Sequence, residues 1–194
     1  EKKYTIVSHA LSVGASFEIP IRYSGIGAAV AIGQEVMIAD GDVGLRIEKI
    51  VDDAHVLCTA LTSGVIYSSQ SIHLGEVVDT FDHLAYAKPH LAAFAEESPD
   101  FVAFSFVNSA EMARDCASAL AAQFRHGHPP AFVAKIESPG GVASCEGILA
   151  YCDWVMIARG DLAVNIPYEQ LGLAQKQIAR SSHLHGRKVI VATH

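Results

Sequence analysis

The chain has 194 residues, of which 51% are hydrophobic and 18% are charged, and its formal net charge is −7. This composition is enough to bury one large core or two small ones, and the 14 lysines and arginines form no basic cluster, which excludes a nucleic-acid partner. No apolar run approaches the ~20 residues of a transmembrane helix, and the N-terminus lacks a signal-peptide pattern, so we expect no membrane partner. The four cysteines have no CxxC spacing, which favours reduced thiols and a cytoplasmic location.

Residues 1–79 have the pattern of a small β-rich domain. Short runs of strand-forming residues alternate with Gly, Asp and Ser throughout this segment. The clearest hairpin is "EVMIADGDVGLRIEKI", residues 35–50, because Asp40-Gly41 favours a tight turn between two alternating runs. A second turn-forming triplet, "TSG", lies at 62–64. We therefore predict a small antiparallel β-domain here.

Residues 80–194 alternate instead between helical and strand patterns. The apolar runs are too continuous for strands with one wet face, which is typical of parallel strands buried under helices. Four strands linked by three complete helices leave two candidates, an open α/β sheet or part of a barrel. The expected strands are 100–107, 131–137, 154–162 and 188–194, and the expected helices are 79–98 with a break at Pro89, 109–124, 144–152 and 168–186 with a stop at Gly186.

Polar residues gather where these predicted strands end. Because the carboxyl ends of consecutive parallel strands meet at one edge, we expect the side chains to share a rim. The rim residues are Ser105 and Asn108 on the first strand, Lys135 and Glu137 on the second, Arg159, Gly160 and Asp161 on the third, and Thr193 on the fourth.

The rim residues indicate metal-assisted chemistry on an anion. Glu137 and Asp161 are the ligand type that Mg²⁺ or Mn²⁺ prefers, and Lys135 would neutralise charge on a phosphoryl group or an enolate oxygen. Backbone N–H groups at Gly160 and Asp161 can face an anion. The alternative is that the Lys–Glu and Arg–Asp neighbours are only ion pairs at a barrel rim.

Five stretches, in order along the chain, resemble the pyruvate kinase family. "GQEVMIADGDVGLRIEKI" resembles the family's small B domain, and the others resemble the middle-to-late strands of its catalytic barrel. The resemblance implies a partial (β/α)8 TIM-barrel segment at 80–194, preceded by a small all-β barrel-like B-type domain at 1–79. The barrel stretches are "PDFVAFSFVNSAEM", "AKIESPGGV", "VMIARGDLAVNIP" and "LAQKQIARSSHLHGRKVIVATH".

The same resemblance implies a role for each site residue. Glu137 and Asp161 match the family's ligands for the divalent cation, and Lys135 matches the lysine at the transferring phosphoryl group. Thr193 matches the threonine associated with proton delivery. The implied substrate-binding residues are Arg159, Gly160, Asp161 and Thr193. The implied reaction is phosphoenolpyruvate plus ADP to pyruvate plus ATP, a step of glycolysis, with Mg²⁺ or Mn²⁺ and, in many relatives, K⁺.

The chain also departs from the family pattern. Where the family has Lys-Gly-Val-Asn, this sequence has 70–73, "QSIH", so a lysine on the nucleotide side is replaced. Asn108 replaces an Arg, and Ala163 and Asn165 stand where the family favours Gly and Glu. The family's N-terminal barrel strands, last strand and C-terminal domain have no counterpart in this sequence, so we expect an oligomer or a complementing chain.

Three functions stay open at this point. The first is a pyruvate kinase-like phosphotransferase, as a fragment or as one piece of an assembly. The second is a Mg²⁺-dependent lyase or decarboxylase of the wider phosphoenolpyruvate/pyruvate barrel group, which needs no ADP site. The third is a non-catalytic pyruvate kinase-like protein.

Overall fold

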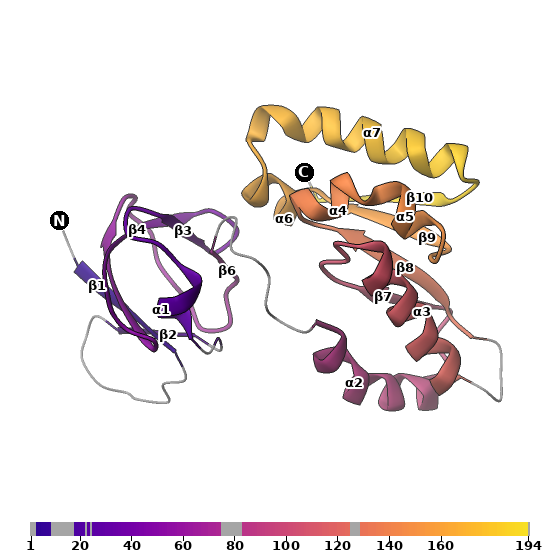
Figure 1. Cartoon of the computed structure of the whole chain (residues 1–194), viewed down its shortest axis with the longest axis horizontal. Coiled ribbons are helices and arrows are strands. Elements are labelled where there is room, and N and C mark those ends of the chain that lie inside the picture. Colours follow the sequence, from indigo (N-terminus) through magenta and orange to yellow (C-terminus); the bar gives the residue numbers. More distant parts are fainter. Residues whose placement is uncertain are drawn as a thin grey trace. The chain divides into compact units, whose positions relative to one another are not determined.

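The computed structural model describes residues 3–8, 18–21, 23, 25–74, 83–124 and 129–193. The chain divides into two compact units, Glu1–Asp79 and Thr80–His194. The elements of each unit carry the labels of Figure 1. No helix in these ranges combines the length and apolar character needed to cross a bilayer.

The first unit is built on a six-stranded sheet. Its strands follow the order β2-β1-β5-β4-β3-β6, and its pairs are antiparallel except for β1 with β2. This arrangement agrees with the antiparallel pattern predicted from the alternating runs. The elements are β1 (Lys3–Ser8), β2 (Glu18–Ile21), α1 (Ile26–Ala29), β3 (Glu35–Ile38), β4 (Val43–Asp52), β5 (His55–Ala60) and β6 (Ile72–His73).

The predicted hairpin at 35–50 is confirmed. Strands β3 and β4 pair antiparallel, with Ile38 opposite Val43 and a loop at 39–42. Ala39, Asp40 and Gly41 have φ angles of 57°, 54° and 100°. The loop is therefore longer than a two-residue turn and includes residues in the left-handed region, where Asp and Gly are favoured over bulkier residues.

The second predicted turn does not join two strands. Strand β5 ends at Ala60, and the structure assigns no strand to 61–71. The hydroxyl of Thr62 accepts a hydrogen bond from the Gly44 N–H at 2.9 Å and lies 3.3 Å from the Asp42 carbonyl oxygen, to which it donates. Side-chain bonds to the neighbouring hairpin thus compete here with a strand ladder.

The second unit contains four parallel strands in the order β10-β9-β8-β7. Each strand is followed or preceded by helices along the chain, as the periodicity predicts. The strands are β7 (Phe101–Phe104), β8 (Ala131–Ile136), β9 (Trp154–Ala158) and β10 (Lys188–Ala192). The helices are α2 (His83–Glu97), α3 (Ala110–Gln123), α4 (Pro139–Ala143), α5 (Cys145–Leu149), α6 (Arg159–Asn165), the 3-10 turn η1 (Tyr168–Gln170) and α7 (Leu171–Leu184).

Helices α2, α3, α5 and α7 form a row on one face of the sheet. Helix α2 packs on α3, α3 on α5, and α5 on α7, following chain order, as Figure 1 shows for this unit. Strand residues such as Phe104, Ile136 and Ile157 lie in the core beneath them. An open doubly wound sheet carries helices on both faces, whereas a barrel wall carries them on its outside only. The arrangement is therefore that of a partial barrel, one of the two predicted candidates.

Several predicted boundaries in this unit are wrong. The strand predicted at 100–107 ends at Phe104, the helix predicted at 144–152 ends at Leu149, and α4 was not predicted. Helix α2 continues through Pro89, because Leu84, Ala87 and Leu91 contact the same core on both sides of it, and this burial outweighs the ~3 kcal/mol cost of an internal proline. The strand predicted at 154–162 ends at Ala158, where α6 begins. The turn after Ala158 places the charged residues of this stretch on a helix entrance.

The predicted stop of α7 is confirmed. Gly186 has a φ of 67°, and the Arg187 N–H donates to the Ser182 carbonyl at 2.8 Å. The Gly186 N–H donates to the His183 carbonyl at 3.0 Å. This pair of bonds satisfies carbonyls that the helix leaves free, and it requires the left-handed conformation that glycine adopts without strain.

Candidate active site

The predicted rim lies at the carboxyl ends of the four parallel strands. Lys135 is on β8 and Glu137 directly follows that strand, while Asp161 is in the first turn of α6, after β9. Thr193 follows β10 and Ser105 follows β7. The topology alone brings these residues to one edge of the sheet.

Lys135 and Glu137 form an ion pair at the centre of the site. The Lys135 Nζ lies 2.7 Å from the Glu137 Oε1 and also donates to the Ser105 Oγ at 3.0 Å. The alternative raised from sequence, an ion pair at the rim, is therefore present for this pair. An ammonium group has three protons, so one remains for another acceptor.

Glu137 is unusual because its carboxylate is buried. The side chain is 1% exposed, and its second oxygen accepts a hydrogen bond from the Phe106 N–H at 2.6 Å. Burial raises the pKa of Glu137, Lys135 and the Phe106 N–H lower it, and the charge of Asp161 raises it further. Phe106 has a φ of 54°, a strained backbone geometry that aims its N–H at this carboxylate.

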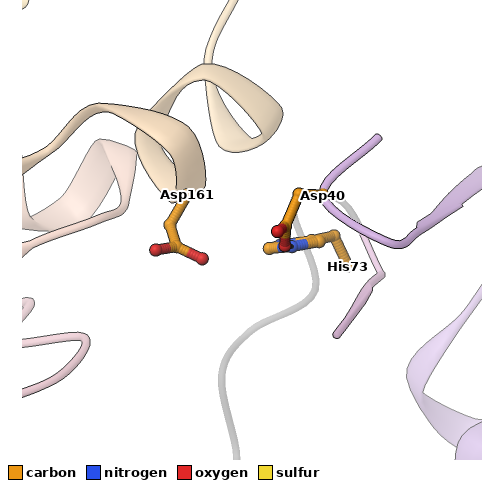
Figure 2. A group of neighbouring side chains, drawn as sticks. All are labelled: Asp40, His73 and Asp161. Carbon is orange, nitrogen blue, oxygen red and sulfur yellow. Dashed lines mark ion pairs between the residues drawn. The ribbon is translucent and has the colours of Figure 1, made fainter. Parts of the chain in front are cut away.

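Asp161 lies in the first turn of α6, at the same edge of the sheet as Glu137, and its charge raises the pKa of Glu137. Its side chain extends from the first turn of α6, as Figure 2 shows. The Asn165 Nδ2 donates to the Asp161 carbonyl at 2.8 Å and to the Glu137 carbonyl at 3.0 Å. Two neighbouring carboxylates repel unless a cation neutralises them. Their oxygens are ligands that suit Mg²⁺ or Mn²⁺, and each can accept more than one interaction, so the donor set fits a hard divalent cation.

Thr193 is held against the entrance of α6. Its Oγ1 accepts a hydrogen bond from the Gly160 N–H at 2.8 Å and donates to the Ala192 carbonyl at 2.7 Å. A Cβ atom at position 160 would lie 3.2 Å from the Thr193 Oγ1, so the close approach favours glycine there. The Gly160 N–H that the sequence offered to an anion is occupied by Thr193 in this structure.

Arg159 does not form the rim ion pair that its spacing suggested. In the ranges that the structure describes, no ion pair joins Arg159 to Asp161. The Arg159 Nε is buried and has no hydrogen-bond partner there. A buried donor without an acceptor costs about 1–3 kcal/mol, which makes this guanidinium a candidate for binding an anion.

The first unit has its own polar group, at the loop between β3 and β4. The Asp40 Oδ1 accepts a hydrogen bond from the Ser71 Oγ at 2.5 Å and lies 3.9 Å from the His73 Nε2. Figure 2 draws Asp40 and His73. Gln70, which replaces the lysine of the resembling family, accepts a hydrogen bond from the Tyr67 N–H at 2.7 Å.

Two contributors to the site had no assigned role in the sequence. Phe106 acts through its backbone N–H, which no residue pattern reveals. Asn165 was singled out only as a departure from the family. The sequence signal for Asn165 is its place one helical turn after Asp161, which puts its side chain next to that residue's carbonyl.

Comparisons with known proteins point to one family. A family model described as "Pyruvate kinase, barrel domain" matches residues 4–194. Pyruvate kinase of Agrobacterium vitis is 33% identical over 177 residues, covering 91% of this chain and 35% of that protein. Pyruvate kinase of Dictyostelium discoideum is 30% identical over 182 residues, covering 93% of this chain and 35% of that protein.

The solved structures agree with the sequence comparisons. Cryptosporidium parvum pyruvate kinase in complex with ADP superposes with a TM-score of 0.89 at 28% identity, covering 99% of this chain and 39% of that chain. The chain thus spans little more than a third of the length of the relatives it matches.

Proposed function

Because the chain belongs to the pyruvate kinase family, we propose that it serves phosphoryl transfer from phosphoenolpyruvate to ADP, giving pyruvate and ATP. The family match confirms the resemblance drawn from the sequence motifs. The observation that supports the activity is the buried Glu137 carboxylate, paired with Lys135 and within electrostatic reach of Asp161. A buried charge is costly even where partners compensate it, and ionisable groups of this kind gather at functional sites.

Glu137 and Asp161 are the residues that would hold a divalent cation, Mg²⁺ or Mn²⁺. A cation there supplies charge neutralisation for the anionic oxygens of phosphoenolpyruvate. Glu137 and Ser105 leave one N–H of the Lys135 ammonium unused. In this proposal that N–H forms a hydrogen bond with an oxygen of the transferring phosphoryl group. We also propose K⁺ as a cofactor.

The remaining rim residues bind and orient the substrate. The guanidinium of Arg159 has an unused buried donor, and the N–H of Asp161 lies in the first turn of α6, where an anion is favoured. Gly160 acts through Thr193, which its N–H contacts. The Thr193 hydroxyl is oriented by the Gly160 N–H, and we assign it to proton delivery at the methylene carbon of the product enolate.

The proposal extends to the parts of the molecule. Residues 1–79 serve as a B-type domain on the nucleotide side, where Gln70 in place of lysine weakens the hold on ADP. Residues 80–194 serve as the catalytic barrel segment, and an oligomer or a complementing chain is the proposed protein partner. We place the protein in the cytoplasm, in glycolysis, with no nucleic-acid or membrane partner.

The test is Mg²⁺-dependent ATP formation from phosphoenolpyruvate and ADP. Glu137→Gln keeps the shape and removes the buried charge, and we expect turnover to fall by roughly 10³-fold or more. Glu146→Gln, at an exposed position on α5, is the matched control and should leave turnover unchanged.

Three outcomes distinguish the functions. The proposal is supported if Glu137→Gln loses ATP formation while the Glu146→Gln control keeps it. Oxaloacetate decarboxylation without nucleotide, in the absence of ATP formation, assigns the chain to the lyases of the same barrel group. Turnover that Glu137→Gln does not change refutes both enzymatic functions.

A further inference from the structure

The side chain of Asn165 links the two residues that carry the proposed cation ligands. Asn165 is the last residue of α6, and its Nδ2 atom donates to the carbonyl oxygens of Asp161 and Glu137 at 2.8 and 3.0 Å. An amide nitrogen carries two protons, so both are used. The bond to Asp161 spans four residues, whereas the bond to Glu137 spans 28.

Backbone pairing between β8 and β9 does not link Glu137 to Asp161. The pairing of β8 with β9 ends at Ile136 opposite Ile157, one residue short of Glu137 and four short of Asp161. Beyond that point no β8–β9 pair is formed, and the segment after β8 leads to α4 while α6 begins directly after β9. Asn165 therefore replaces the missing ladder at the point where the carboxylates emerge.

An amide suits this position better than a carboxylate. Glu137 and Asp161 already repel each other, and the groups that Asn165 contacts are carbonyl oxygens, which need donors. An ionised Asp or Glu offers acceptors only, so it would add repulsion and lose both bonds.

We propose that Asn165 is a positioning residue, whose amide fixes Glu137 and Asp161 at the spacing that one divalent cation requires. The inference rests on the cation site proposed above. Residues that orient metal ligands typically contribute 10–100-fold to metal affinity. Asn165 itself touches neither the cation nor the substrate in this proposal.

The first test measures Mn²⁺ affinity by electron paramagnetic resonance of the free ion. Asn165→Asp has the same shape, and its added negative charge would by itself tighten Mn²⁺ binding. If the amide positions the carboxylates, we expect binding to weaken by about 10-fold or more instead. Gln177→Glu adds the same charge at an exposed position on α7 and should leave Mn²⁺ affinity unchanged.

The second test needs no metal. The Phe106 N–H bonds to the Glu137 carboxylate, so its hydrogen exchange reports how firmly Glu137 is held. In Asn165→Asp we expect exchange at Phe106 to accelerate by about 10-fold, while the amide of Cys116 in α3 keeps its wild-type rate. Asn165→Ala, which removes both donors without adding charge, replaces the Asp variant if that variant fails to fold.

The outcomes separate the two proposals. Faster exchange at Phe106 together with weaker Mn²⁺ binding supports the positioning role. If the wild-type chain binds no Mn²⁺ but Phe106 exchange still accelerates, the cation site fails and the amide link stands as a structural device only. Unchanged exchange and unchanged Mn²⁺ affinity in a folded variant overturn the role of Asn165.

Discussion

The hairpin loop of the first unit and the strand-end rim of the second unit both carry carboxylates, but in opposite environments. The Asp40 side chain is 73% exposed, whereas that of Glu137 is 1% exposed and bonded to Lys135 and the Phe106 N–H. An exposed charge costs little, while a buried one costs several kcal/mol unless partners compensate it. The second unit therefore keeps a carboxylate buried, and its bonds offset the free energy lost on desolvation. A cation site needs carboxylates that are held in place in this way.

The two hydrophobic cores allow the largest test of this comparison. Leu45 is 1% exposed in the core of the first unit and Ile157 is 0% exposed in that of the second. Truncating either to Ala should lower the free energy of unfolding of its own unit by about 2–5 kcal/mol. Hydrogen exchange of strand amides measures each unit separately.

Each substitution serves as the control for the other. Leu45→Ala should leave the protection of β8 and β9 unchanged, and Ile157→Ala should leave that of β4 and β5 unchanged. Equal loss of protection in both units, from either substitution, contradicts the separation into two cores.

The buried thiols predict that the stability of the two units depends differently on pH. Burial raises the pKa of Cys58 in the first unit to about 11, and in the second unit that of Cys116 to about 12 and those of Cys145 and Cys152 to about 11. The unfolded thiols ionise first, near 9.0. The stability they contribute is therefore complete below that pH and is lost as the pH rises through the folded values, by on the order of 1 kcal/mol per thiol near pH 10.

Alkaline destabilisation should thus fall more heavily on the second unit, which has three of the four thiols. Urea unfolding followed by the fluorescence of Trp154, the only tryptophan, reports that unit. We expect Cys116→Ala to reduce the loss of stability between pH 8 and 10 by about a third. A pH dependence unaltered by that substitution would contradict the assignment.

The smallest expected effects on stability come from substituting two glycines, one in α7 and one just after its end, and the two effects have opposite signs. Gly186 has a φ of 67°, so Gly186→Ala should destabilise the second unit by about 1 kcal/mol. Gly172 lies in the first turn of α7 without a left-handed φ, and a Cβ there meets nothing within 4 Å. Gly172→Ala should stabilise by about 0.5–1 kcal/mol, and thermal unfolding measures both. The same sign for both variants would refute the helix end described here.

Periodicity predicted most of the second unit because its strands are apolar runs and its helices α3 and α7 each bury one face. Burial on both faces was not borne out for every strand, since burial alternates along β7 and β10 has no fully buried residue. Strand β8 and helix α3 fall within one or two residues of the expected positions. Pro89 shows the limit, since local propensity forbids what core packing allows. The loop after β5 shows another, because side-chain bonds from Thr62 to the hairpin are invisible in a local pattern.

The residues of the candidate site were predictable to the same degree. Strand ends gave Lys135, Glu137 and Asp161 together, because parallel topology brings any such residues to one edge. The contacts that set their geometry were not predictable. The Phe106 N–H reaches Glu137 across 31 residues and Asn165 across 28, and each depends on how the chain turns after its strand.

We propose that Glu137 and Asp161 together hold one divalent cation. The most direct test of this proposal is a crystal of the protein soaked in Mn²⁺ and measured at the manganese absorption edge. We predict one anomalous peak at about 2.0–2.2 Å from a carboxylate oxygen of each residue. The peak should be absent in Glu137→Gln. Manganese bound elsewhere, or carboxylates that face apart with no peak between them, would contradict it.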